Sequence, residues 1–221
     1  MNEDSYLTIK NPSTGEYKAK GSKFFSYAYR VDSEEDIKSN LEEIKKEHFK
    51  SRHVCYAYRL DIAGTQYRAN DDGEPSGTAG LPILNVLKSH QIVKSLIAVV
   101  RYFGGTKLGV SGLIQAYKTC AQDAIVDSNI QEEYIIDNVR LDFNYDQLGT
   151  LMNIVAASPF KIIDQSYEEN PFLVLSSRHS KTTDNLISVY SKILGYDISD
   201  LDIVKDHEIK HTLLKQTEGL F

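Results

Sequence analysis

An uninterrupted apolar run, SLIAVVRYF at residues 95–103, leads directly into a glycine-rich segment and then into a helical pattern. A run of this kind, rich in β-branched residues, is typical of a central strand that is covered on both faces. The residues GGTKLG predict a tight loop, and the apolar repeat from Leu113 onward predicts a long amphipathic helix that begins near Ser111. The chain is therefore expected to contain a buried sheet with at least one helix packed against it.

The residues before this run predict further strands and two helices. Strands are expected at 6–10, at 17–31 and within HVCYAYRL, which starts at His53. Ser33 is followed by three acidic residues and then by Ile37, Leu41 and Ile44 at helical spacing, which predicts an N-cap and an inward-facing apolar stripe. A short helix is expected from Pro82 to about Leu87.

From Tyr134 onward the pattern changes. NVRLDFNY predicts a strand, Asp146 a helix N-cap, and FKIIDQSY with FLVLSS a hairpin. A helix from Ser180 and a last strand between Ile203 and Leu214 complete the order strand, helix, strand, strand, helix, strand. This is the order of a ferredoxin-like domain. We therefore expect an α+β protein with one domain at 1–134 and a second at 135–221.

Composition narrows the function classes. The net charge of the 221-residue chain is −6, with 17 Lys and Arg against 18 Asp and Glu up to Glu133, and 8 against 13 from Tyr134. Nucleic-acid-binding domains are usually basic, so broad duplex binding is disfavoured while a local basic patch in the first half stays open. The acidic start MNEDSYLTIK is not a secretory signal and no apolar run is long enough to span a bilayer. We expect a cytoplasmic protein, with no membrane partner and two reduced cysteines, and favour a monomer.

The glycine-rich segment has two interpretations. Glycines allow positive φ and close backbone approach, a helix start offers free N–H groups, and Arg and Lys bind phosphate, so the segment has the parts of an anion site. It is not a P-loop, because Leu108 follows the lysine. The candidate phosphate- or RNA-binding residues here are Arg101, Gly104, Gly105, Thr106, Lys107, Ser111 and Gly112. The alternative is a purely structural turn between a buried strand and a buried helix.

A second polar loop, NDDGEPSG, carries Asp71, Asp72 and Glu74. The spacing does not match a calcium loop, so no metal and no cofactor is expected. The acids are candidates for recognition of a substrate or partner, and the alternative is that they hold turns. Arg68 precedes the loop and is a further candidate phosphate-binding residue, able either to pair with these acids or to face the same ligand.

Two other groups of residues each have a functional and a structural interpretation. His53 and Cys55 share a strand face but show no orienting third group, so packing explains them more simply than catalysis, and no catalytic residue is assigned. Basic residues interleaved with aromatics have two interpretations: each group alone is typical of a solvated face, and together they are compatible with local RNA contact. They comprise Lys18, Lys20, Lys23 and Arg30 in one strand region and Lys45, Lys46, Lys50 and Arg52 around a helix end.

Three segments in order, SRHVCYAYRL, NDDGEPSGTAGLPIL and VVRYFGGTKLGVSGLIQAY, resemble the hallmark motifs of the Impact/YigZ family. The resemblance covers about residues 18–129, and the tail resembles the small second domain of bacterial members. It implies a two-layer α/β first domain, similar to a ribosomal protein, GHMP kinases and domain IV of elongation factor G. The second domain is implied to resemble the last domain of that factor.

The resemblance also implies a link to translation. Eukaryotic relatives block activation of an initiation-factor kinase through an additional N-terminal domain that this sequence does not show, so that role is not expected here. The leading hypothesis is a non-enzymatic protein that binds RNA, the ribosome or a translation-factor-related protein. The alternatives are an enzyme acting on a phosphorylated small molecule at the glycine-rich loop, and a pure protein-interaction module.

Overall fold

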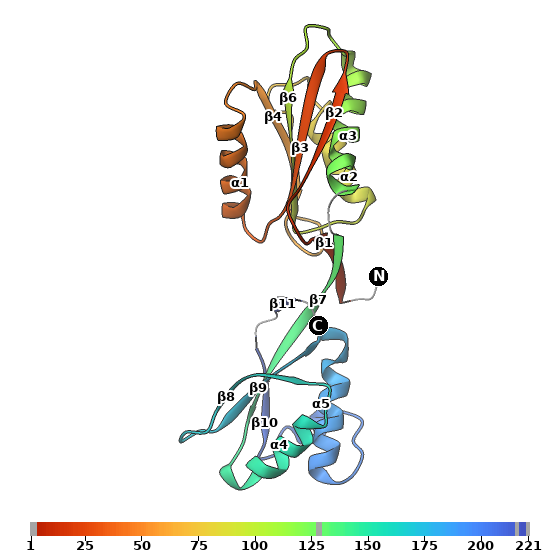
Figure 1. Ribbon diagram of the computed structural model, residues 1–221. Coiled ribbons are helices and arrows are strands. Elements are labelled where there is room, and N and C mark those ends of the chain that lie inside the picture. The colour runs from red at the N-terminus through yellow and green to blue at the C-terminus, as the bar shows by residue number, and fades with distance from the viewer. Residues whose placement is uncertain (1–3, 127–129, 215–216, 220–221) are drawn as a thin grey trace. The chain divides into compact units, whose positions relative to one another are not determined.

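The structure, a computed structural model, describes residues 4–126, 130–214 and 217–219 (Figure 1). The chain forms two compact units. One comprises residues 6–132, and the other comprises residues 133–221 together with the first five residues.

The first unit is built on a five-stranded antiparallel sheet in the order β2-β3-β6-β4-β5. Its strands are β2 (Ser13–Ala19), β3 (Ser22–Arg30), β4 (His53–Arg59), β5 (Tyr67–Asn70) and β6 (Ser95–Tyr102). The apolar run thus forms the middle strand, and residues 95–101 are all buried. The prediction of a central strand covered on both faces is confirmed.

Helices cover both faces of this sheet. Helix α1 (Glu34–Glu47) lies on one side, and α2 (Gly80–Ser89) and α3 (Gly109–Val126) lie on the other (Figure 1). The two-residue alternation of β6 explains this: Ile97 and Val99 pack in the cluster of α2 and α3, whereas Ala98 and Val100 pack with Ile44 of α1. The unit therefore has three layers, which corrects the two-layer expectation, because the apolar stripe of α1 needs a sheet face of its own.

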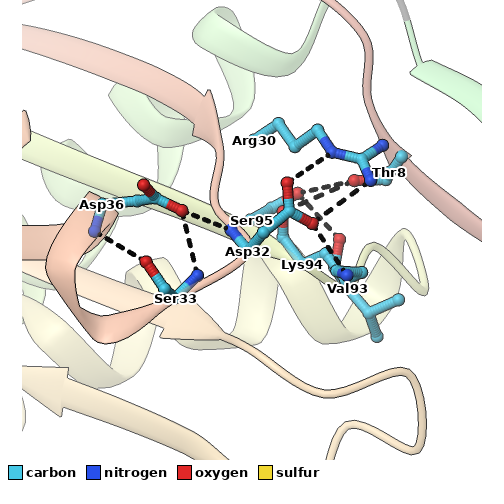
Figure 2. Close-up of polar contacts among 8 residues, drawn as sticks. All are labelled: Thr8, Arg30, Asp32, Ser33, Asp36, Val93, Lys94 and Ser95. Carbon is cyan, nitrogen blue, oxygen red and sulfur yellow. Dashed lines mark hydrogen bonds and ion pairs between the residues drawn. The ribbon is translucent and has the colours of Figure 1, made fainter. Parts of the chain in front are cut away.

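The start of α1 is fixed by its N-cap. The Asp36 N–H donates to Ser33 Oγ at 3.1 Å, and the Asp36 carboxylate accepts from the Ser33 N–H at 3.0 Å (Figure 2). The cap that the sequence predicts at Ser33 is confirmed. Asp32, just before it, accepts from Arg30 and pairs with Lys94 Nζ at 2.7 Å, which ties the β3–α1 connection to the turn before β6 (Figure 2).

The second unit follows the predicted order of elements. Its elements are β7 (Ile130–Asp142), α4 (Leu148–Ala156), β8 (Lys161–Ser166), β9 (Phe172–Arg178), α5 (His179–Leu194), β10 (Lys210–Leu213) and β11 (Thr217–Gly219). Short 3₁₀ helices at Tyr145–Gln147 and Leu201–Val204 precede α4 and β10, so the start of the range expected for the last strand is helical. All pairings between β7, β8, β9, β10 and β11 are antiparallel.

The sheet of this unit runs β7-β9-β8, and β10 and β11 also pair with β7, whereas β1 (Ser5–Ile9) lies mostly within residues 6–132. Its core gathers apolar residues of α4 and α5 against β7 and β9, with Leu141, Leu173, Leu151 and Tyr190 almost fully buried. No helix in the described ranges has the length and apolarity needed to cross a membrane.

Candidate nucleic-acid interface

Three strands of the first unit bring basic and aromatic residues to one end of the sheet. In the antiparallel register Arg101 of β6 lies opposite Phe24 of β3 and opposite His53 of β4. The ends of β6 and the starts of β3 and β4 therefore meet at the same edge, although the three segments are far apart in sequence.

Arg101 forms the buried centre of this edge. Its side chain is 8% exposed, and Nη1 donates to Glu74 Oε1 at 2.6 Å. The Tyr117 hydroxyl donates to the same oxygen at 2.9 Å, so the carboxylate is held from two sides. Removing one partner of such a pair leaves an uncompensated buried charge and costs about 3–5 kcal/mol.

One donor of this arginine is not used. Arg101 Nε is buried and has no hydrogen-bond partner among the residues that the structure describes. A buried donor without a partner costs about 1–3 kcal/mol.

The thiol of the cysteine beneath this pair is buried and hydrogen-bonded. Cys55 is fully buried, and its thiol donates to the Asp71 carbonyl at 3.0 Å and lies 3.3 Å from the Tyr117 hydroxyl. The pKa of this thiol is raised to about 12, mainly by burial and also by the nearby acids, while the hydrogen bond with Tyr117 acts in the opposite direction. His53 Nδ1 is bound to the Asp72 carbonyl at 2.7 Å rather than to the thiol. The residues form a packed strand, with no catalytic pair.

A cleft of about 400 Å³ opens at the Arg101 end of the sheet. We call it the cationic cleft, and its lining consists of Lys50, Arg52, His53, Arg101, Tyr102 and Phe103. Lys50 and Arg52 are exposed and have no carboxylate partner within the described part of the chain, and Phe103 is 57% exposed. The cleft therefore combines free positive charge with an accessible aromatic ring.

A second hollow of about 500 Å³ shares Tyr102 and Phe103 with the cationic cleft. This aromatic hollow is lined by Gly21, Lys23, Phe25, His48, Tyr102 and Phe103. Both ring nitrogens of His48 are engaged, one with the Tyr102 hydroxyl at 2.9 Å and one with the Tyr27 hydroxyl at 2.5 Å. The ring of His48 also stacks on Phe25. Lys23 is thus the basic residue that the hollow offers to a ligand.

The glycine-rich loop lies beside this surface but does not line it. The Gly104 N–H donates to Ser22 Oγ at 3.2 Å, and a Cβ at Gly104 would collide with the Gly21 backbone. Gly105 adopts φ +89°, which a side chain would strain. The glycines of this turn therefore have a structural role. They allow the chain that follows β6 to leave the sheet close to the β2–β3 turn.

The polar members of that loop are exposed. Thr106 and Lys107 face solvent, and Lys107 has no ion-pair partner among the described residues. Helix α3 begins at Gly109, two residues before the predicted start, so Ser111 and Gly112 lie in its first turn. None of these four residues lines the cationic cleft or the aromatic hollow.

The acids of the polar loop have separate roles. The Asp71 carboxylate accepts the N–H groups of Gly77, Ala79 and Gly80 at 2.8–2.9 Å. Burial acts to raise the pKa of Asp71, but these three hydrogen bonds outweigh it and lower the pKa. Asp72 accepts from the Val54 N–H at 2.7 Å. Both hold the loop, with Asp72 bonded to the start of β4, whereas the Glu74 carboxylate pairs with Arg101.

Arg68 is not part of this surface. It lies on β5 opposite Tyr58, five residues along β4 from His53, which corresponds to about 17 Å of extended strand. It lines a separate cavity of about 300 Å³ beside α1, with Glu34, Lys38 and Glu42. The pairing of β4 with β5 places Arg68 toward the other end of the strand, away from Arg101, so its phosphate-binding role stays a prediction for a separate position. The guanidinium that pairs with the polar loop is that of Arg101.

Sequence reasoning identified some members of this surface and missed others. Lys23, Lys50 and Arg52 belong to the basic groups that the sequence indicated, whereas Lys18 pairs with Glu16, and Arg30 with Asp32. Phe103 and Tyr117 were not singled out. Phe103 could have been identified from its position at the end of the buried run, because an aromatic residue just beyond a strand is no longer covered by the sheet. Within the described ranges no cluster of three or more metal-ligating side chains occurs.

Comparison with known proteins agrees with the three sequence motifs. The Impact N-terminal domain family model matches residues 20–125. IMPACT family member YvyE of Bacillus subtilis (strain 168) is 36% identical over 166 residues, which cover 75% of this chain and 76% of that protein. IMPACT family member YigZ of Escherichia coli (strain K12) is 32% identical over 170 residues, covering 75% and 82%.

A solved structure supports the same relationship at the level of the fold. A crystal structure described as that of a hypothetical protein is 27% identical, covers 96% of this chain and 98% of its own, and superposes with a TM-score of 0.66. The resemblance stated from the sequence motifs is confirmed, and the chain belongs to the IMPACT family.

Proposed function

We propose that this protein binds single-stranded RNA in the cationic cleft and the aromatic hollow, as a non-enzymatic component of translation. The observation that carries the proposal is the cleft itself, where Lys50 and Arg52 stand free beside the exposed ring of Phe103. Proteins that bind single strands combine a positively charged groove, which follows the phosphates, with aromatic rings on which bases stack.

The surface combines exposed aromatic rings with free cations. This combination favours RNA, which has both bases and phosphates, over a ligand that is only charged. Phe49 is 75% exposed and lies beside Lys50, whose ammonium is 5.4 Å from the ring centroid. Aromatic side chains that remain exposed next to free cations provide both stacking and charge. The nearly neutral first unit as a whole does not attract duplexes broadly, so binding is confined to this edge.

Family membership and the second unit support the translation part of the proposal. The resemblance stated above implies that eukaryotic IMPACT relatives act in translation. The antiparallel order β10-β7-β9-β8, with α4 and α5 in the connections, supports a ferredoxin-like second domain like the last domain of elongation factor G. A ribosome or a translation-factor-related protein is then the expected larger partner, in the cytoplasm.

The test is RNA binding measured over a salt series. Fluorescence anisotropy with a labelled single-stranded RNA should show affinity that falls as salt rises. The Lys50→Ala/Arg52→Ala variant should lower the slope of log K against log salt by about 1.4, because each phosphate contact to a single strand contributes about 0.7.

A matched control removes two exposed lysines from helices outside the surface. The Lys38→Ala/Lys118→Ala variant makes the same charge change and should leave the slope unchanged, since neither lysine lines the cleft or the hollow. Equal slopes for both variants, or no binding at low salt, would overturn the proposal. A rise in melting temperature with nucleotides or sugar phosphates but no RNA binding would instead favour an enzyme of phosphorylated small molecules; saturation at 100 times Kd stabilises by about 2.7 kcal/mol.

A further inference from the structure

We infer that the cationic cleft is the binding site for a terminal phosphate monoester of the RNA, whereas the aromatic hollow takes an internal phosphodiester. The inference rests on the proposed function and adds to it the part of the RNA that is recognised. It is carried by the difference in charge between two adjoining hollows and by the unused donor of Arg101.

The charge of the cationic cleft matches a dianion. The positive charge of Arg101 is balanced by Glu74, which leaves the two charges of Lys50 and Arg52 without a carboxylate among the described residues. A phosphate monoester carries a charge of about −1.5 to −2 at pH 7, whereas a phosphodiester carries a single negative charge. Two unbalanced cations in one small cleft therefore complement a chain end better than an internal phosphate.

A buried guanidinium also contributes to the lining of the cleft. Arg101 is more than nine-tenths buried, lines the cleft and keeps Nε without a partner in the described structure. Glu74 accepts from this guanidinium and is itself held by the Tyr117 hydroxyl, so the Arg101 side chain is fixed in place. A phosphate oxygen is the acceptor that a guanidinium binds most specifically, and a monoester offers three such oxygens.

The aromatic hollow has the composition expected for the next nucleotide. It shares Tyr102 and Phe103 with the cationic cleft, and its basic side chain with a free charge is Lys23. Both nitrogens of His48 are engaged with tyrosine hydroxyls and its ring packs on Phe25, so that side chain forms part of the aromatic wall of the hollow. One cation and several rings suit one diester and one base.

The experiment compares one short RNA with three kinds of end: a 5′-phosphate, a 3′-phosphate, or hydroxyls at both ends. Each competes against a labelled RNA for the wild-type, full-length protein. We expect one of the phosphorylated forms to bind at least about tenfold more tightly than the hydroxyl form, and the arm that does so identifies which end is recognised.

Substitutions in each hollow distinguish the role of the cationic cleft from that of the aromatic hollow. Arg52→Ala should reduce the end preference to about threefold or less, whereas Lys23→Ala should weaken all three RNAs alike and leave the preference unchanged. Arg101→Gln/Glu74→Gln removes both charges of the buried pair together, which avoids an unpaired buried charge, and should also lose the preference. A melting curve establishes that this variant is folded.

The outcomes distinguish the two proposals. Equal affinity for all three RNAs overturns the terminal-phosphate inference and leaves RNA binding intact. Absence of binding by any of the RNAs overturns both. Lys23→Ala could instead abolish the preference while Arg52→Ala leaves it unchanged. The terminal phosphate would then bind in the aromatic hollow, which would also overturn the inference. The main comparison uses the wild-type protein, so a folding defect in a variant does not decide it.

Discussion

Among the described residues, each unit contains an ion pair between a buried carboxylate and an arginine, and the two pairs differ in how completely their hydrogen bonds are satisfied. In the second unit the Asp4 carboxylate accepts from Arg178 Nη2 at 2.9 Å, and from the Ser180 N–H and hydroxyl at 3.1 and 2.6 Å. Arg178 also lies over the Tyr134 ring, with Cζ 3.7 Å from the centroid. In the first unit Arg101 keeps a buried donor without a partner and borders an open cleft.

On the inference above, the difference is one between a structural pair and a pair that borders a ligand site. A buried charge that has all its hydrogen bonds stabilises one conformation, and nothing is gained by adding an acceptor. A buried charge with a donor left over, held rigidly beside free cations, is stabilised further by an anion. The contrast can be tested through stability in both units and through binding in the first.

The largest effect is expected from Glu74→Ala. This substitution leaves the Arg101 guanidinium buried without its carboxylate and should lower the free energy of unfolding by about 3–5 kcal/mol. Urea denaturation measures it. A loss below about 1 kcal/mol would mean that Arg101 behaves as a solvated surface charge, and the comparison of two buried pairs would fail.

Asp4→Asn should cost somewhat less, about 1.5–3 kcal/mol at pH 7, because it replaces hydrogen bonds to a charged group by neutral ones. Burial acts to raise the pKa of Asp4, but the hydrogen bonds from Arg178 and Ser180 outweigh it and lower the pKa to about 2. A carboxyl with a lowered pKa stabilises the folded state fully above its unfolded pKa of about 3.9 and loses this contribution as the pH falls toward its folded pKa.

Measuring the free energy of unfolding from pH 5 to pH 2 checks the direction of this pH dependence. The wild type should lose stability between about pH 4 and pH 2, and the Asp4→Asn variant should lose less over that window. An identical pH profile for both proteins would show that Asp4 does not titrate differently in the folded state.

Gly104→Ala tests whether the glycine loop is structural where it meets the sheet. The added Cβ collides with the Gly21 backbone, so we expect a loss of about 1–3 kcal/mol in urea denaturation. Gly149→Ala in helix α4 is the control: its Cβ meets nothing within 4 Å, and it should stabilise by about 0.5–1 kcal/mol. Destabilisation by both variants to the same degree would argue against a specific contact at Gly104.

The smallest effect is expected from Lys107→Ala. Lys107 is exposed on the glycine-rich loop and lines neither hollow, so RNA affinity should fall by less than about threefold. Anisotropy under the conditions used for the Lys50→Ala/Arg52→Ala variant measures it. A loss as large as that of the double variant would move the binding site onto the glycine loop.

Much of the local structure could be predicted because its causes are local. The β-branched run at 95–103 indicated a strand covered on both faces, and the Ser33 cap follows from side chains three residues apart that bond each other's backbone. The number of layers could not be predicted in the same way. Whether α1 packs beside the other helices or on the opposite face depends on strand order, which involves contacts between residues distant in the chain.

The candidate site shows the same division. Sequence indicated Arg101 as an anion-binding residue and Glu74 as a recognition residue, yet the two are 27 positions apart and their pairing was not foreseen. Arg68 was grouped with the loop that follows it, but strand pairing places it opposite Tyr58 and beside α1. Proximity in sequence was therefore a poor guide to which charges meet.

By itself the sequence determined the family, through three motifs in order, the α+β character, and the presence of a glycine-rich turn flanked by basic and aromatic residues. Those features depend on residue identity and on spacing over a few residues. The tertiary structure alone decided which cations stand free and which are neutralised, because an ion pair forms wherever the sheet register brings opposite charges together. The antiparallel register of β3, β4 and β6 places Lys50 and Arg52 beside Arg101 and leaves their charges open to a ligand.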